Sequence, residues 1–208
     1  MEREVVLMDF ERHFKGKADY PLVLAFASDD GTRFEWGDFL GNKKFHHMLI
    51  RDSRSRQYTE GVLGIGNLAE TILYINNVKS FYFKTVAIGL SNAGYGALYI
   101  GKLTQVEKVV CMSAVTGLYI KDEFDPKWYH RLIPRPGGPH IVDLKPLYQF
   151  DPKPVVKAFI GNGYGTELDR QMVERIGVTD ITELNGVSHA DVGKIVRDNG
   201  MLEKAILE

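Results

Sequence analysis

The sequence is poor in cysteine and in long apolar runs, and each shortage narrows the class of protein. A single cysteine, Cys111, excludes an internal disulfide, so a reducing compartment, the cytoplasm, is the expected location. Cys111 lies in the apolar run VEKVVCMSA, which indicates a buried structural thiol and not a reactive one. No apolar run approaches the roughly 20 residues of a membrane span, and the first residues lack the apolar core of a signal peptide. Neither segment is therefore expected.

Net charge is also close to zero. The 26 Lys and Arg residues are offset by 27 Asp and Glu residues, so no general attraction to nucleic acid or to an anionic membrane is expected. His46 and His47 are adjacent in a predicted strand, which places their side chains on opposite faces. No Cys, His and Asp cluster has the spacing of metal ligands, so no metal site is predicted.

The pattern of apolar residues predicts an α/β fold. The 208 residues suit a single domain, residues 1–208. Runs such as PLVLAFA, KTVAIGL and PVVKAFIG are almost continuously apolar, as is typical of strands covered on both faces of a parallel sheet. Helical patterns alternate with them, which favours a doubly wound, mostly parallel sheet with helices on both faces. Predicted strands are 4–9, 22–27, 45–51, 85–89, 108–113, 155–160 and 181–184; predicted helices are 68–80, 93–103, 167–176 and 190–207.

Residues 118–150 break this alternation. They hold five of the eight prolines together with Trp128 and Tyr129. Linkers rarely carry so many aromatic residues, so we interpret the segment as a small insertion, or cap, over one end of the sheet. Trp128 and Tyr129 are candidates for lining a substrate pocket, and simple packing over the sheet is the alternative.

The stretch VAIGLSNAGYGALYIG joins a predicted strand to a predicted helix with a single serine, Ser91, at the joint. A nucleophilic serine needs an exposed oxygen, a base within reach and donors for the oxyanion. A tight strand-to-helix turn exposes the oxygen, but it requires small residues close to the serine. Gly89, Ala93 and Gly94 meet that requirement. The turn therefore predicts Ser91 as a nucleophile.

Candidate partners follow in the order that such a turn requires. His189 comes after the last predicted strand and before the last predicted helix, where a general base is expected. Glu167 and Asp169 both follow the strand before it, and either could orient the imidazole. Asp169 is our preferred acid, with Glu167 as the alternative. A surface acid in the first turn of a helix would look the same.

The decapeptide GLSNAGYGAL resembles the nucleophile elbow of α/β-hydrolase-fold esterases, many of which read G-x-S-x-G-G-Y-G-A-L. The order Ser91, Asp169, His189 is that of the superfamily, and the likeness covers nearly the whole chain. Two features depart from it: Ala93 replaces a glycine, and the acid loop lacks the usual G-x-x-D spacing. The stretches LDRQMVERI and SHADVGKIVRDNGMLEKAI also resemble a small group of bacterial hydrolase-like proteins found near surface-polysaccharide genes, which favours Asp169.

The resemblance implies an oxyanion hole formed by the backbone N–H groups of Asn92 and of Ser28, or Ala27 in place of Ser28. Arg51 and Arg54 follow a strand at the same edge and could bind an anionic or polyhydroxyl substrate. A solvated loop is the ordinary explanation for these arginines.

These features predict a serine hydrolase for a carboxylic ester, either small or carbohydrate-linked, that needs no cofactor. Two alternatives stay open. The same residues could transfer an acyl group to an alcohol if water is excluded from the pocket. The fold could instead serve as a binding module without turnover.

Overall fold

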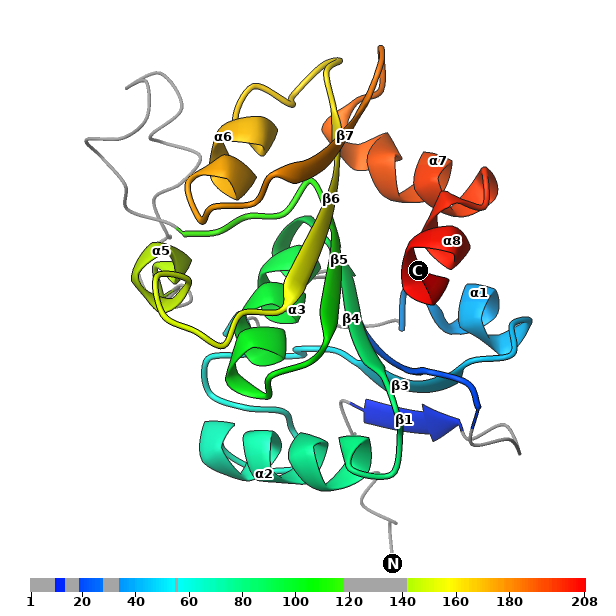
Figure 1. Cartoon of the computed structure of the whole chain (residues 1–208), viewed down its shortest axis with the longest axis vertical. Coiled ribbons are helices and arrows are strands. Elements are labelled where there is room, and N and C mark those ends of the chain that lie inside the picture. The colour runs from blue at the N-terminus through cyan, green and yellow to red at the C-terminus, as the bar shows by residue number, and fades with distance from the viewer. Residues whose placement is uncertain (1–9, 14–18, 28–33, 55, 118–141) are drawn as a thin grey trace, which may run out of the picture.

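Seven segments of the chain, most of them rich in apolar residues, assemble into one sheet in the computed structural model, which describes residues 10–13, 19–27, 34–54, 56–117 and 142–208 (Figure 1). The strand order is β1-β3-β2-β4-β5-β6-β7, in which β1 is antiparallel to β3 and every other pair is parallel. The strands are β1 (Phe10–His13), β2 (Leu22–Phe26), β3 (His46–Ile50), β4 (Thr85–Leu90), β5 (Lys108–Met112), β6 (Val155–Gly161) and β7 (Asp180–Leu184).

Helices cover both faces of this sheet, as predicted (Figure 1). One layer holds α2, α3, α5 and α6, and the other holds α1, α7 and α8. The helices are α1 (Gly37–Gly41), α2 (Leu68–Lys79), α3 (Ser91–Leu103), α5 (Leu144–Leu147), α6 (Asp169–Glu174), α7 (Val192–Asp198) and α8 (Met201–Leu207), with a 3-10 turn η1 (His189–Asp191).

Alternate residues of each central strand supply two separate apolar cores. In β2, Leu22, Leu24 and Phe26 belong to the core under α2 and α3, whereas Val23 and Ala25 belong to the core under α1, α7 and α8. Each fully buried Leu, Val or Phe side chain contributes about 1.5–3 kcal/mol by leaving water. The period of two along a strand therefore stabilises both helical layers at once.

Most predicted elements are confirmed. Predicted strands 22–27 onward correspond to β2 to β7, while predicted strand 4–9 lies outside the described residues. The prediction of one helix over 190–207 is wrong, because Gly200 adopts a left-handed φ of 72° and separates α7 from α8. Cys111 is fully buried, as predicted, and burial raises the pKa of its thiol to about 12. No helix in the described part of the chain is long and apolar enough to cross a bilayer.

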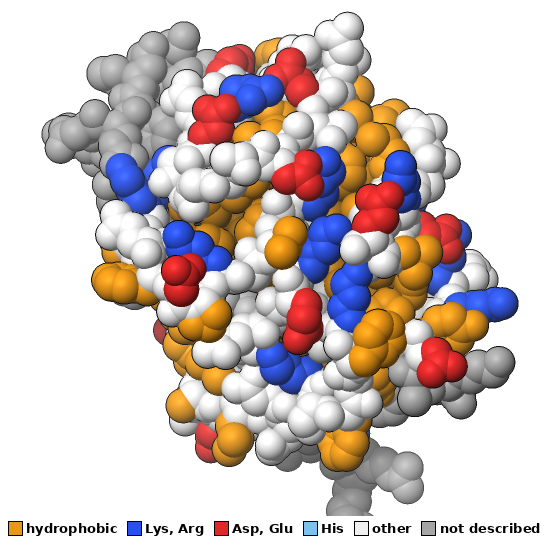
Figure 2. Space-filling view, viewed as in Figure 1, with side chains coloured by type: hydrophobic (Ala, Val, Ile, Leu, Met, Phe, Trp, Pro, Cys, Tyr) orange, Lys and Arg blue, Asp and Glu red, His pale blue; other side chains and the backbone are white. Residues whose placement is uncertain are grey.

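Charges of both signs are mixed on the surface drawn in Figure 2. Lys and Arg side chains lie among Asp and Glu side chains, and neither sign gathers into a single patch on this face. On this face of the molecule the two signs of charge are therefore interspersed.

Thr116, just before the predicted insertion 118–150, and Asp143 and Leu144 within it meet beside α6. The Arg175 guanidinium donates to Asp143 Oδ1 at 2.7 Å and to Asp143 Oδ2 at 3.1 Å. The Leu144 N–H donates to the Thr116 carbonyl at 3.0 Å, and the Thr116 hydroxyl donates to the Met172 carbonyl at 2.7 Å. Most of the insertion, including Trp128 and Tyr129, lies outside the described residues, so its role as a cap stays a prediction.

The Asp143–Arg175 pair predicts a pH-dependent contribution to stability. Burial raises the pKa of Asp143, but hydrogen bonds from Arg175 and from the Lys145 backbone outweigh it and hold the pKa below the ordinary 3.8. A depressed carboxyl pKa stabilises the fold above the unfolded pKa, and this contribution is lost as the pH falls through the folded pKa. We expect Asp143→Asn to cost about 1 kcal/mol at pH 7, because water partly screens the carboxylate. Urea unfolding at pH 7 and pH 3 should show the cost shrinking; an equal cost at both pH values would exclude this origin.

Candidate active site

Ser91 stands at the joint between β4 and α3, with no residue between the strand and the helix. Its backbone has a φ of 52°, in the left-handed region that a serine rarely occupies. Such a conformation costs about 1–3 kcal/mol and persists only where the surrounding structure enforces it. The turn therefore has the strained geometry that the sequence predicted, and Ser91 is left partly exposed.

The small residues beside Ser91 have the steric purpose that the sequence indicated. A Cβ atom at Gly89 would lie 2.2 Å from the Ala93 carbonyl oxygen, and one at Gly94 would lie 2.7 Å from the Ala114 Cβ. Ala93 itself is fully buried, so the turn accommodates a methyl group where the resemblance had a glycine. Strand β4 and helix α3 can approach this closely only while positions 89 and 94 lack side chains.

We expect Gly89→Ala to destabilise the fold by about 3 kcal/mol, because the new methyl group would overlap backbone atoms that cannot rotate away. Gly41→Ala is the matched control: no atom lies within 4 Å of a Cβ added there, and we expect a change below about 0.5 kcal/mol. Urea unfolding midpoints measure both. A Gly89→Ala protein as stable as the wild type would mean that the turn is not tightly constrained.

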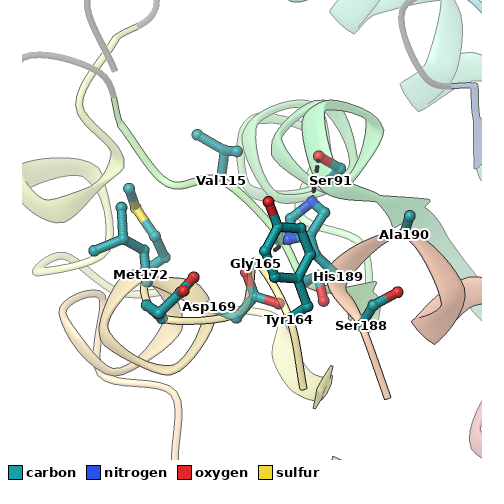
Figure 3. A pocket seen from close by; sticks show the side chains of 13 residues that line it. Ser91, Val115, Tyr164, Gly165, Asp169, Met172, Ser188, His189 and Ala190 are labelled. Carbon is teal, nitrogen blue, oxygen red and sulfur yellow. Dashed lines mark hydrogen bonds and ion pairs between the residues drawn. The ribbon is translucent and has the colours of Figure 1, made fainter. Parts of the chain in front are cut away.

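Three side chains from separate elements meet at this turn (Figure 3). His189 Nε2 lies 2.9 Å from Ser91 Oγ, and His189 Nδ1 lies 2.7 Å from Asp169 Oδ1. An ionised carboxylate only accepts, so in a neutral imidazole Nδ1–H donates to Asp169 and Nε2 accepts the Ser91 hydroxyl proton. Ser91 follows β4, Asp169 follows β6 and His189 follows β7, so the three elements converge at the carboxyl edge of the sheet.

Asp169, and not Glu167, makes the contact with His189. Asp169 is the first residue of α6 and is 5% exposed, whereas Glu167 is exposed in the loop before it. The second carboxylate oxygen, Asp169 Oδ2, is buried with no hydrogen-bond partner among the described residues. The structure thus brings together the preferred three residues of the sequence analysis.

The loops that carry the acid and the histidine are joined through their backbones, which the sequence analysis missed. Gly163 N–H donates to the Val187 carbonyl at 2.9 Å, and His189 N–H donates to the Tyr164 carbonyl at 3.3 Å. A Cβ at Gly161 would lie 2.1 Å from the Val187 oxygen, so the glycine is needed for the loops to touch. The glycine-rich stretch NGYG, which directly follows Gly161, is the feature of the sequence from which this contact could have been predicted.

Of the predicted oxyanion donors, Asn92 and Ala27 lie within the described residues. Asn92 is the second residue of α3, so its backbone N–H has no intrahelical acceptor and is free of the helical hydrogen-bond ladder. The Ala27 N–H already donates to the Ile50 carbonyl at 2.8 Å, which removes it as the alternative donor. Ser28 lies outside the described residues, and its role stays a prediction.

Each of the two predicted substrate-binding arginines contacts a group outside the Ser91, His189 and Asp169 constellation. Arg54 donates to the Gly61 carbonyl at 3.1 Å, within its own loop. The Arg51 guanidinium lies 4.9 Å from the centre of the Phe34 ring. Neither lines the cavity beside Ser91, and a role for either in substrate binding stays a prediction.

A cavity of about 380 Å³ opens beside Ser91 and His189 (Figure 3). Loops after β5, β6 and β7 form its walls, and several of its residues carry no functional signal in the sequence. The lining residues are Ser91, Ser113, Ala114, Val115, Tyr164, Gly165, Glu167, Leu168, Asp169, Met172, Ser188, His189 and Ala190. Within the described chain, no group of three or more His, Cys, Asp or Glu residues is placed to hold a metal ion.

Comparison with known proteins places the fold. No protein-family model matches the chain, and no curated protein sequence matches it. Solved structures do match. The capsule O-acetyltransferase of Neisseria meningitidis serogroup A aligns with a TM-score of 0.63 and 14% identity, covering 96% of this chain and 91% of the other.

Two further structures align over most of their length. MGS-M2, an α/β hydrolase enzyme from a Medee basin deep-sea metagenome library, has a TM-score of 0.60 and 9% identity, covering 96% of this chain and 94% of the other. Est1E from Butyrivibrio proteoclasticus has a TM-score of 0.57 and 12% identity, covering 90% and 89%. These alignments agree with the strand order of this chain and with the strained strand-to-helix turn at Ser91. The protein has the α/β-hydrolase fold.

Proposed function

We propose that the protein is a serine hydrolase that cleaves a carboxylic ester through an acyl-enzyme intermediate. The observation that carries this proposal is the chain of two hydrogen bonds from Ser91 through His189 to Asp169, built on the strained turn. Strain of this kind is maintained where function needs it. A buried carboxylate, an oriented imidazole and an exposed hydroxyl form the arrangement that activates serine nucleophiles.

The proposed reaction begins when Ser91 Oγ attacks the ester carbonyl and passes its proton to His189 Nε2. Asp169 stabilises the imidazolium ion and keeps Nδ1 protonated. The Asn92 N–H, assisted by Ser28, donates to the oxyanion. His189 then protonates the departing alcohol. Water attacks the acyl-enzyme with His189 as base, the bond between the acyl group and Ser91 Oγ breaks, the acid leaves, and His189 returns the proton to Ser91. Each proton and charge is handled by a group of the chain itself, so the proposal invokes no cofactor.

Acyl transfer to an alcohol is the second candidate, and one comparison favours it. A capsule O-acetyltransferase aligns with a TM-score of 0.63 over 96% of this chain. Transfer would use the same acyl-enzyme, with an alcohol replacing water in the second step. The alcohol half of the ester, or the acceptor, would be a small molecule or a carbohydrate.

Turnover of 4-nitrophenyl acetate, with and without methyl glucopyranoside as acceptor, tests both candidates. A hydrolase releases acetate in either case. A transferase releases 4-nitrophenol faster when the acceptor is present and yields acetylated glycoside by mass spectrometry. Absence of turnover under both conditions, in folded protein, would contradict the proposal and favour a binding module.

A further inference from the structure

The described lining of the cavity beside Ser91 carries negative charge only. Its described lining includes two carboxylates, Glu167 and Asp169, and contains no lysine or arginine. A phosphorylated or carboxylated substrate group would meet negative charge there, with no cation in the described lining to offset it. The lining therefore favours an uncharged ligand part, with Glu167 as an acceptor for hydroxyl groups.

Tyr164 presents a large aromatic surface at this cavity. Its side chain lines the cavity together with Ser91 and His189, yet it is 84% exposed (Figure 3). The loop around it is held in place, because the Tyr164 carbonyl accepts from His189 N–H and the Thr166 hydroxyl donates to the Gly163 carbonyl at 2.8 Å. An exposed ring on a fixed loop is a ready contact surface, because little conformational freedom of the backbone is lost on binding.

Ser113 supplies a buried polar atom at the same cavity. It lines the same cavity, is 1% exposed, and its hydroxyl has no hydrogen-bond partner among the described residues. Its backbone is in the left-handed region, with a φ of 45°. Strain and an unsatisfied buried hydroxyl at one residue are features of functional positions. A hydroxyl-bearing ligand could satisfy Ser113.

We infer that this cavity binds the alcohol half of the substrate as an uncharged, polyhydroxylated ring, a sugar, with Tyr164 as the stacking surface and Ser113 as a hydrogen-bond partner. The inference rests on the proposed function, because it assigns a substrate class to the same site. The apolar C–H face of a sugar contacts an aromatic ring, and its hydroxyls both donate and accept. The exposed Tyr164 ring, the Ser113 hydroxyl and the carboxylate of Glu167 together match that mixture of surfaces.

A comparison of two acetyl esters, one with a sugar ring and one without, tests whether the cavity binds a sugar. We compare methyl 6-O-acetylglucopyranoside with ethyl acetate, which carries the same acetyl ester of a primary alcohol without a ring. Tyr164→Ala should lower the ratio of kcat/KM for the sugar ester to kcat/KM for ethyl acetate about tenfold, through KM for the sugar ester. A tenfold change corresponds to about 1.4 kcal/mol, within the range of aromatic contacts. Tyr164→Phe should restore most of the ratio, and Ser113→Ala should lower it severalfold.

A control and a binding measurement complete the test. Phe81 is 80% exposed and does not line the cavity, so Phe81→Ala should leave the ratio unchanged. Calorimetric binding of methyl 6-O-acetylglucopyranoside to Ser91→Ala protein should weaken about tenfold when Tyr164→Ala is added. If the wild type hydrolyses ethyl acetate but Tyr164→Ala leaves the ratio of the two kcat/KM values unchanged, the inference is overturned and the hydrolase proposal stands. If neither ester is hydrolysed while Tyr164-dependent binding persists, the hydrolase proposal fails and the sugar site stands.

Discussion

Replacing Ser91 with alanine is expected to reduce kcat/KM for ester hydrolysis by about 10⁵-fold or more, because the proposed acyl-enzyme forms on the Ser91 hydroxyl. The hydroxyl lies 2.9 Å from His189 Nε2, and we expect that contact to activate it. The fold should be unaffected, since alanine keeps the Cβ atom and Ser91 is only partly buried. Initial rates with 4-nitrophenyl acetate, on protein with an unchanged urea midpoint, measure the loss.

His189→Ala should cost nearly as much, and the double variant should be no worse than Ser91→Ala alone. Residues that act as one unit lose their effect together, so their single losses do not add. Fully additive losses would indicate that the two residues act independently. Additive losses would contradict the mechanism even if each single variant had little activity left.

Asp169→Asn is expected to lower kcat by about 10³- to 10⁴-fold, the second large effect. Asp169 Oδ1 lies 2.7 Å from His189 Nδ1. An amide can present an N–H toward that nitrogen, which would favour the tautomer with the proton on Nε2. That tautomer cannot accept the Ser91 proton. The loss should appear in kcat more than in KM, because substrate contacts are unchanged.

Glu167→Gln is the matched control for the acid. It removes the same charge two residues away, at an exposed side chain that does not contact His189. We expect kcat for ethyl acetate to stay within about threefold of the wild type, because the imidazole keeps its partner. A larger loss with Glu167→Gln than with Asp169→Asn would reverse the assignment of the acid.

Much of the fold is predictable from local pattern. The apolar runs that became β2 to β5 are almost wholly buried on both faces, and their period of two supplies both cores, whereas β7 at the edge of the sheet is only half-buried. The short α1 was not predicted, because five residues from Gly37 carry little periodic signal. The break at Gly200 was also missed, since one glycine in a helical pattern is tolerated as often as it ends the helix.

Some residues of the site could likewise be predicted from the sequence, and others could not. Ser91 could be found because its turn imposes a steric requirement on Gly89 and Gly94, which is visible in the sequence. His189 could be found because of its place after the last strand. Between Asp169 and Glu167, the sequence offered only a preference, since which carboxylate reaches the histidine depends on how the loops pack. Tyr164 and Ser113 were missed because loop residues with no periodic pattern carry no local signal of a shared cavity.

Labelling with a fluorophosphonate probe, located by mass spectrometry, tests the activated serine most directly because it needs no knowledge of the substrate. The account predicts a phosphonylated Ser91 in the wild type and no labelling at that position in Ser91→Ala or His189→Ala protein. A folded wild type that stays unlabelled at Ser91, or that is labelled equally well without His189, would contradict it.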